Sequence, residues 1–343
     1  NVRVLAARGL SLKELGQLEA AEAAYRQALA VKSDHFPALH NLAGVLRLSG
    51  RAKQAVEVYQ HALRLGPKVP ELRYAYATAL YDTGDTDAAD REFRTAIALK
   101  PDYVEAHDAL NRLYWQHGRQ DLYGKSYTTC LSAAPLSAPL REAQVRALEL
   151  AGQLEAAREV ADAAVQAVGP TAGLLHRRAR IMAAQGDSEA ALRSYHEANE
   201  VAGKAEGAPI RLDEAKLLTR LGRYDEALAV LAQVESHMPD NQEMWAYRGL
   251  CWRLSGDPRA AWLNDYDRFV SAARLGTPAG YSSLGAFLTD VAETLTGLHT
   301  SEGQPIDQTL KGGTQTNGAL FARQEAVITA LRCEIEKIVA AYI

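Results

Sequence analysis

Small and aromatic residues recur through the first 270 residues at fixed distances from a glycine. The glycines are spaced by 34 residues, with one interval of 36, and they are Gly16, Gly50, Gly84, Gly118, Gly152, Gly186, Gly222 and Gly256. The fifth residue after the glycine is small in most units, and the ninth is mostly aromatic, as in Ala21 and Tyr25. This period predicts two antiparallel helices in each unit, joined by a turn at the glycine.

Each recurring position has a physical role in such a pair of helices. The glycine permits the tight turn, where a Cβ would be costly. The small residue lets the two helices approach closely, and the aromatic residue fills the space between successive pairs. Proline ends the second helix of several units because it cannot continue the hydrogen-bond ladder. These prolines are Pro67, Pro101, Pro135 and Pro239.

The segments LGQLEAAEAAYRQAL at 15–29 and SGRAKQAVEVYQHAL at 49–63 show the pattern. They resemble the tetratricopeptide repeat family, and the resemblance covers about residues 2–275, roughly eight units. It implies an all-α fold, a right-handed α-solenoid of about eight helical hairpins with a short C-terminal helical extension. We therefore predict two domains, a solenoid at 1–275 and an extension at 276–343.

The later units depart from the pattern. Repeat four has Tyr123 where a small residue is expected, and repeat five has Ala161 in the aromatic position. Repeat eight places Asp265 and Arg268 on the face that should be buried. Since the terminal repeats of a solenoid are atypical, we expect the solenoid to end there or to pack against another part of the protein.

The first helix of each hairpin is expected to line a concave groove, with the fifth and ninth positions of the repeat pointing into it. Repeats four to seven place a cation at the ninth position, and these cations are Arg112, Arg146, Arg180 and Lys216. Such a basic ladder suits the carboxylates or carbonyl groups of an extended peptide. Alternatively, Asp108 and Glu142, each four residues earlier on the same helix, neutralise two of the cations on a solvated face.

Aromatic and histidine side chains complete the predicted groove. Tyr74, Tyr81 and Trp115 are candidate apolar anchors for a ligand. His40 and His176 occupy the fifth position and are isolated, which favours groove or surface histidines over metal ligands. Tyrosines at the aromatic position of the repeat are expected in the core.

The 34-residue rhythm stops after residue 278. Apolar residues at helical spacing predict one helix at 281–298 and a second from about 320 to 343, with a polar, turn-rich stretch at 300–318 between them. Gly312, Gly313, Thr314, Gln315 and Thr316 lie in this stretch. The glycines allow unusual backbone angles and the three polar side chains offer hydrogen bonds, so this is a candidate loop site. The alternative is a loop that packs against a further domain.

The segments WLNDYDRFV at 262–270 and LHTSEGQPIDQTLKGGTQTNGALF at 298–321 carry a second resemblance. They are similar to bacterial tetratricopeptide proteins with a C-terminal domain assigned to the 2-oxoglutarate and Fe(II)-dependent oxygenases. That resemblance implies an iron site of two histidines and one carboxylate. None of the nine histidines begins a His-x-Asp or His-x-Glu motif, so the family's ligands would lie beyond Ile343. We expect no catalytic residue, metal ligand or cofactor in this chain itself, and Fe(II) and 2-oxoglutarate only with that further domain.

Composition restricts the remaining classes of function. A net charge of -4 and a pI near 6.2 argue against a nucleic-acid partner. No apolar run reaches the roughly 18 residues that would cross a bilayer. Cys130, Cys251 and Cys333 are odd in number and far apart, which fits a reducing compartment and favours the cytoplasm. Since the sequence begins at Asn1 and not at a methionine, the removal of an upstream targeting segment is a further alternative.

Three tryptophans stand close together in or after the last repeat: Trp245, Trp252 and Trp262. They are consistent with a homodimer contact, or with a seal between the last repeat and the helix at 281–298. The sequence as a whole predicts a scaffold that binds a protein or peptide segment in its groove. The alternative is a part of an oxygenase that acts on a polypeptide.

Overall fold

The computed structural model describes residues 1–299, 316 and 319–343, and of residues 204–206 it describes the backbone alone. All regular structure in these residues is helical, and no strand occurs among them. The described chain divides into two compact units, which we treat separately. Unit 1 contains residues 1–123 and 273–343, and unit 2 contains residues 124–272. The predicted boundary at 275 differs from this division and stays a prediction.

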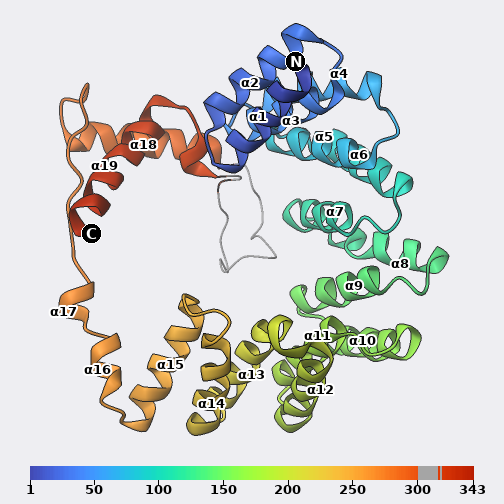
Figure 1. Ribbon diagram of the computed structural model, residues 1–343, viewed down its shortest axis with the longest axis vertical. Coiled ribbons are helices and arrows are strands. Elements are labelled where there is room, and N and C mark those ends of the chain that lie inside the picture. The colour runs from blue at the N-terminus through green and yellow to red at the C-terminus, as the bar shows by residue number, and fades with distance from the viewer. Residues whose placement is uncertain (300–315, 317–318) are drawn as a thin grey trace. The chain divides into compact units, whose positions relative to one another are not determined.

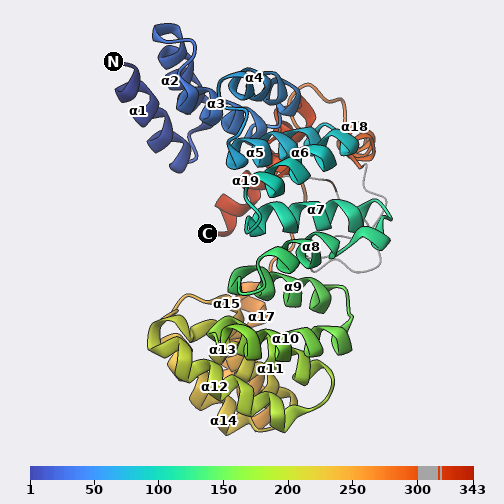
Figure 2. The ribbon, with the colours of Figure 1, turned by 90° about the vertical axis from the view of Figure 1, so that its right-hand side faces the viewer.

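Unit 1 begins with three helical hairpins and a further long helix (Figures 1 and 2). Its elements are α1 (Val2–Glu14), α2 (Leu18–Val31), α3 (Phe36–Leu48), α4 (Ala52–Leu65), α5 (Pro70–Asp82), α6 (Thr86–Leu99), α7 (Val104–Gln116) and the short 3₁₀ helix η1 (Gln120–Leu122). After residue 273 the unit adds α18 (Leu284–Leu298), the 3₁₀ helix η2 (Leu320–Ala322) and α19 (Ala326–Tyr342).

Unit 2 continues the repeat with the same alternation of first and second helices (Figure 1). Its elements are α8 (Lys125–Ala133), α9 (Ala138–Leu150), α10 (Leu154–Val168), α11 (Ala172–Ala184), α12 (Ser188–Glu206), α13 (Ala208–Arg220), α14 (Tyr224–Glu235), α15 (Gln242–Ser255), α16 (Arg259–Leu263) and α17 (Tyr266–Phe269). The prediction of an all-α solenoid of helical hairpins with a helical C-terminal extension is therefore confirmed.

The eight recurring glycines occupy the turns after the first helices, as the sequence predicts. Their φ angles all lie between 68° and 88°, in the left-handed region that disfavours residues with a Cβ. The backbone at these turns, and not only side-chain packing, thus fixes the 34-residue rhythm.

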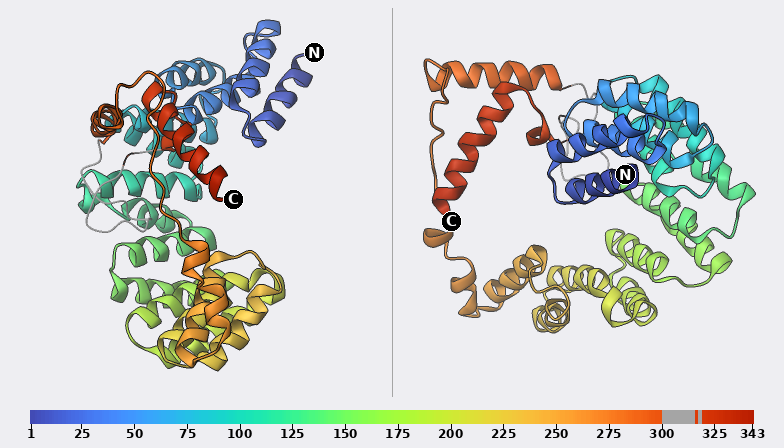
Figure 3. Two further views of the ribbon diagram at one scale, coloured as in Figure 1. Left: turned by 90° about the vertical axis from the view of Figure 1, so that its left-hand side faces the viewer. Right: turned by 45° about the horizontal axis from the view of Figure 1, so that its top comes forward.

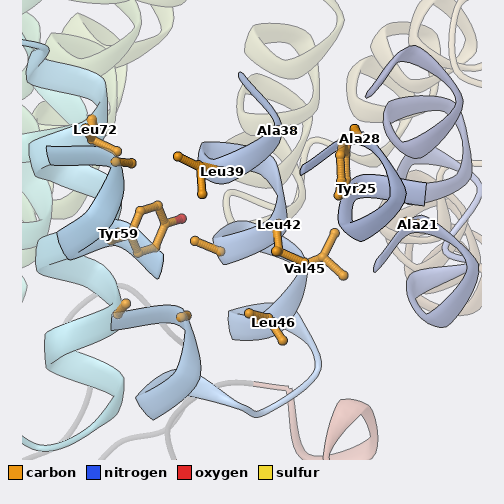
Figure 4. Close-up of a cluster of buried hydrophobic side chains, with 14 residues drawn as sticks. Ala21, Tyr25, Ala28, Ala38, Leu39, Leu42, Val45, Leu46, Tyr59 and Leu72 are labelled. Atoms are coloured by element: carbon orange, nitrogen blue, oxygen red, sulfur yellow. The ribbon is translucent and has the colours of Figure 1, made fainter. Parts of the chain in front are cut away.

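The core of the first repeats consists of the predicted small and aromatic residues. Tyr25 and Tyr59 are almost fully buried, as are Ala21 and Ala55. Figure 4 shows Leu42 among the side chains of α3, which lie between α2 and α5. The tyrosines of the aromatic position therefore belong to the core, as expected.

The irregular repeats deviate where their sequences do. In repeat four, helix α8 begins only after Gly124, whose φ is 78°. Tyr123, in place of a small residue, packs its ring 5.4 Å from that of Trp115. In repeat eight the second helix ends at Leu263, and Asp265 caps the next short helix by accepting a hydrogen bond from the Arg268 backbone N–H. Asp265 and Arg268 are exposed, so the regular repeat ends at this point.

An ion pair between successive hairpins recurs with a spacing of 29 residues. It joins the sixth residue after one turn glycine to the first residue after the next, as in Glu22 with Arg51 (3.0 Å) and Asp90 with Arg119 (2.9 Å). In unit 2 the charges are reversed, and Arg158 lies 3.6 Å from Asp187. Because the carboxylates of Glu22 and Asp90 are mostly buried, these pairs fix how neighbouring hairpins pack.

Helices α18 and α19 form a separate pair in unit 1 (Figure 3). Phe287 and Val291 of α18 pack against Val327 and Ile328 of α19. The second predicted helix begins later than the pattern indicated, because residues 320–322 form η2 and the helix proper starts at Ala326.

Candidate binding faces on the first helices

A small cavity, open to solvent, lies on the first helices of unit 1, and we call it the aromatic cavity. It measures about 160 Å³ and is lined from α1, α3, α4 and α5. Its lining residues are Lys13, His40, Asn41, Gly44, Arg47, Leu48, Tyr59, Tyr74, Ala75 and Thr78. It is smaller than the roughly 300–1,000 Å³ of pockets for small organic ligands, a size that suits a single side chain.

Four of these residues, including Gly44, occupy the fifth and ninth positions of repeats two and three. His40 packs between the rings of Phe36 (6.5 Å) and Tyr59 (6.0 Å). Tyr74 lies against Tyr103 (5.3 Å between ring centroids), and its carbonyl accepts a hydrogen bond from Thr78. Local helical spacing thus places His40 and Tyr74 in one cavity.

Two cations border the aromatic cavity. Arg47 pairs with Asp82 at the end of α5, with 3.1 Å between Nη1 and Oδ2. Lys13 forms no ion pair with any residue in the described part of the chain. Burial, together with the charge of Lys13, lowers the pKa of His40, so the imidazole is neutral at pH 7. The cavity therefore combines aromatic walls with an uncompensated ammonium group.

Tyr81 and Trp115 lie elsewhere in unit 1. The hydroxyl of Tyr81 donates to Gln116, and its ring meets that of His117 edge-on at 6.0 Å. The half-buried Trp115 packs on Tyr123. Neither residue lines the aromatic cavity, and their role as ligand anchors stays a prediction.

On unit 2, the corresponding face carries a network of ion pairs. Glu149 of α9 accepts hydrogen bonds from two arginines of α11, Arg177 (3.3 Å) and Arg180 (2.7 Å). Asp213 of α13 accepts from His176 (2.8 Å) and also lies 3.5 Å from Arg180. The network thus joins three successive first helices.

Lys216 extends this network to the last repeat. Its ammonium lies 2.9 Å from Asp213 and 2.6 Å from Glu243 of α15. Burial alone would lower the pKa of Lys216, but the two carboxylates outweigh it and raise the pKa. Lys216 is a charged, half-buried member of the network.

Asp213 is the centre of the network. Burial alone would raise the pKa of its carboxyl group, but hydrogen bonds from His176 and Lys216 and the charge of Arg180 lower the pKa to about 2. Its side chain is only 16% exposed. Arg180 and Lys216, two members of the predicted basic ladder, therefore already hold carboxylates, and so does His176.

The other two members of the ladder are half-buried. Arg112 lies on α7 of unit 1 and Arg146 on α9 of unit 2. The pKa of Arg177 is lowered mainly by burial, and the nearby positive charge of Arg146 lowers it further. Glu142, the proposed partner of Arg146, accepts a hydrogen bond of 2.5 Å from the Thr171 hydroxyl. A ligand-binding role for these cations stays a prediction.

Sequence reasoning missed Lys13 and Arg47 as groove residues. Both stand three positions before the turn glycine of their repeats, in the same place as Tyr81 and Trp115. Reading that position through all repeats would have found them. It would also have found Glu149, the acid that holds Arg180.

The candidate loop site falls almost wholly outside the described residues. Gly312, Gly313, Thr314 and Gln315 lie there, and only Thr316 is described, as half-buried. An iron site needs two histidines and a carboxylate close together. No three histidine, cysteine, aspartate or glutamate side chains gather in this way among residues 1–299, 316 and 319–343, so the residues present do not fit Fe(II).

Within the described residues Cys130, Cys251 and Cys333 are free thiols. None of the helices that the structure describes has the length and apolar character to span a bilayer.

The rings of Trp252 and Trp262 each lie 6.4 Å from that of Trp245, and Trp262 is exposed.

Comparison with curated proteins gives two partial matches. The chain is 32% identical over 104 residues to the protein CTR9 homolog of Arabidopsis thaliana, covering 30% of the chain and 10% of that protein. It is 32% identical over 118 residues to cellulose synthase operon protein C of Xanthomonas axonopodis pv. citri (strain 306), covering 32% of the chain and 8% of that protein. The chain thus spans a tenth or less of the length of these relatives.

Solved structures with similar folds share little sequence with the chain. A tetratricopeptide repeat protein from Parabacteroides merdae ATCC 43184 has 17% identity and a TM-score of 0.48, and the match covers 73% of this chain and 98% of that one. The structure of Naa15/Naa10 bound to HypK-THB has 20% identity and a TM-score of 0.38, with coverage of 78% and 42%.

Family models identify the repeats themselves. One tetratricopeptide repeat model matches residues 46–113 and 182–251, and a second matches residues 6–70. Both lie within the predicted repeat region and together cover more than half of the chain. The resemblance of residues 262–321 to oxygenase proteins stays a prediction. With its glycine turns, buried aromatic positions and these matches, the chain belongs to the tetratricopeptide repeat family.

Proposed function

We propose that the chain is a scaffold that binds an extended polypeptide segment along the first helices of its repeats, with the aromatic cavity as the main anchor. The observation that carries the proposal is a cavity of about 160 Å³ at the groove positions of repeats two and three. Its aromatic walls suit one apolar side chain of the ligand.

The charges around the cavity favour an acidic residue next to that side chain. Lys13 has no carboxylate partner among the described residues, and the neutral His40 adds no competing charge. A ligand carboxylate beside the anchor would form a charge-assisted hydrogen bond with Lys13. The proposed ligand therefore contains an aromatic or large aliphatic residue close to Asp or Glu.

The first helices of unit 2 contribute less in this proposal. A ligand carboxylate at Arg180 or Lys216 would have to displace Glu149, Asp213 or Glu243. Exchanging one carboxylate for another gains little free energy. Arg112, Arg146, His176, Tyr81 and Trp115 act in the proposal as secondary contacts for the rest of the segment.

A substitution at Gly44 tests the proposal without removing any contact. Gly44 is helical, and an added Cβ would meet only Tyr59 at 3.7 Å and Lys13 at 3.9 Å, which are ordinary contacts. Gly44→Ala is therefore tolerated and raises helix propensity. Gly44→Leu extends its side chain into the cavity and occupies the place of the anchor.

Peptides that bind the wild-type chain would be selected from a phage-displayed library of random 12-residue sequences, and their affinities measured by fluorescence anisotropy. We expect selected peptides to share an apolar residue beside an acid. Gly44→Leu should weaken binding at least about tenfold, a loss of roughly 1.4 kcal/mol, while Gly44→Ala binds as wild type. Equal affinities for the Leu variant and wild type would refute the aromatic cavity as the anchor.

The oxygenase alternative rests on the resemblance of residues 262–321 alone. Release of succinate by a longer form of the protein, supplied with Fe(II) and 2-oxoglutarate, would support it. In that case the repeats would select the polypeptide on which the reaction occurs. Absence of succinate release by a form that extends beyond residue 343 would count against it.

A further inference from the structure

A second, larger cavity of about 380 Å³ lies in unit 1 and is lined mainly by cationic and small residues. We call it the cation cavity. It is formed by the turn between α3 and α4, the end of α5, and the segment before α19. The residues that line it are Arg47, Leu48, Gly50, Arg51, Ala52, Lys53, Gln54, Asp82, Thr83, Ala319 and Arg323.

Two segments of the chain, residues 47–53 and the segment before α19, supply the positive charge. Arg47 and Arg51 flank the turn at Gly50, Lys53 lies in the first turn of α4, and Arg323 comes from the C-terminal segment. The backbone of Arg323 packs closely on the turn, since a Cβ on Gly50 would lie 3.3 Å from the Cα of Arg323. The cations thus surround a preformed space.

The acids around this cavity do not balance its cations. Arg47 pairs with Asp82, and Arg323 pairs with Glu325. Arg51 pairs with Glu22, but Glu22 is shared with Arg26. Three carboxylates therefore serve four arginines, and Lys53 makes no ion pair within the described residues. Of the four cations that line the cavity, Lys53 is thus the one without a carboxylate partner in the described structure.

The geometry of Arg51 leaves a donor unused. Both of its Nη atoms bond to Glu22, while its Nε is buried and has no hydrogen-bond partner in the described structure. The first turn of α4 also has no acidic residue and no side-chain cap, so its partial positive charge adds to that of the cations.

From these observations we propose that the cation cavity binds a phosphate group, either as the free ion or as the phosphate ester of a larger ligand. A phosphate carries negative charge and several acceptor oxygens, which suit the unpaired Lys53 and the donors of three arginines. The volume exceeds that of one phosphate ion, so part of the group that carries the phosphate also fits. This site is distinct from the anchor site in the aromatic cavity, although Arg47 and Leu48 border both cavities.

Isothermal titration calorimetry of the whole chain tests the proposal with two probes at constant ionic strength. The first is inorganic phosphate, and the second is the peptide Ala-Ala-pSer-Ala-Ala, compared with its unphosphorylated form. Lys53→Glu and Arg323→Ala should each weaken phosphate binding by about tenfold or more, since each removes a charge-assisted contact. Lys68→Ala removes an exposed lysine of unit 1 outside the cavity and should bind as wild type.

A loss of phosphate binding by the Lys53→Glu variant would not result from unfolding. Lys53→Glu places an acid in the first turn of α4, which favours the helix, so weaker binding by this variant reports on the site. Tighter binding of the phosphopeptide than of inorganic phosphate would support an ester ligand, and equal binding would support the free ion. No heat with either probe, or an equal loss with Lys68→Ala, would overturn the proposal.

Discussion

The first-helix faces of the two units use their charged residues in opposite ways. In unit 2, Glu149, Asp213 and Glu243 hold Arg180 and Lys216 in a network that spans repeats five to eight. In unit 1, the equivalent positions in the first three repeats are mostly uncharged or aromatic and leave a cavity. The same helical framework thus produces one face occupied by its own ion pairs and another that contains a cavity.

This difference teaches that a ladder of like charges in a repeat sequence is weak evidence for a binding site. A cation is available to a ligand only if no acid on a neighbouring helix already pairs with it. Otherwise the ligand has to displace that acid. In the aromatic cavity, Lys13 has no ion-pair partner among the described residues, and the sequence pattern did not single it out.

Removal of Asp213 should destabilise unit 2 most. Asp213→Ala leaves His176, Arg180 and Lys216 without their common carboxylate, which we expect to lower the free energy of unfolding by about 2–4 kcal/mol. Trp115 is the one tryptophan outside unit 2, so in a Trp115→Phe background the fluorescence during urea unfolding reports on unit 2. Glu243→Ala removes a carboxylate that is 52% exposed and should cost less than about 1 kcal/mol. Equal losses for the two variants would contradict the central position of Asp213.

The contribution of Asp213 should disappear in acid. Its pKa is lowered from 3.8 to about 2 in the folded chain, so the unfolded chain takes up the proton first as the pH falls. The stability of the wild type relative to Asp213→Asn should be constant above pH 4 and fall by about 2 kcal/mol between pH 4 and pH 2. Urea unfolding at a series of pH values measures this difference. A difference that does not change with pH would show that the carboxylate is not stabilised by its neighbours.

Lys13 should matter little for folding. Because it forms no ion pair with the described residues, Lys13→Ala should change the free energy of unfolding by less than about 0.5 kcal/mol. In the proposed function it binds a ligand carboxylate, so the same variant should weaken the selected acidic peptides about threefold to tenfold. A loss of stability without a change in peptide affinity would show that Lys13 serves folding and not ligand binding.

The fold was predictable because its determinants are local. Glycines at the turns need positive φ angles, and Ala21 and Tyr25 lie one helical turn apart on a single helix. The positions of His40 and Tyr74 followed from the same helical geometry. The shortened second helices of repeats four and eight also agree with sequence departures at Tyr123 and Asp265.

The pairing of charges was not predictable, because the partners are distant in sequence. Arg180 bonds to Glu149, 31 residues earlier, and to Asp213, 33 residues later. Glu142, the within-helix partner proposed for Arg146, accepts a hydrogen bond from Thr171, the residue that precedes α11. Packing between hairpins sets these contacts, and a pattern within one repeat does not contain that information. The cation cavity was missed for the same reason, since Arg323 joins Arg47 across most of the chain.

The central claim, that the aromatic cavity of unit 1 holds the anchor side chain of a bound peptide, has a direct test. A selected peptide would carry benzoylphenylalanine in place of its apolar anchor, be photo-crosslinked to the wild-type chain, and the attached residues be identified by mass spectrometry. We predict crosslinks within α3 and α5, at residues 36–48 and 70–82, that are lost in Gly44→Leu. Crosslinks concentrated on α11 and α13 of unit 2 would contradict it.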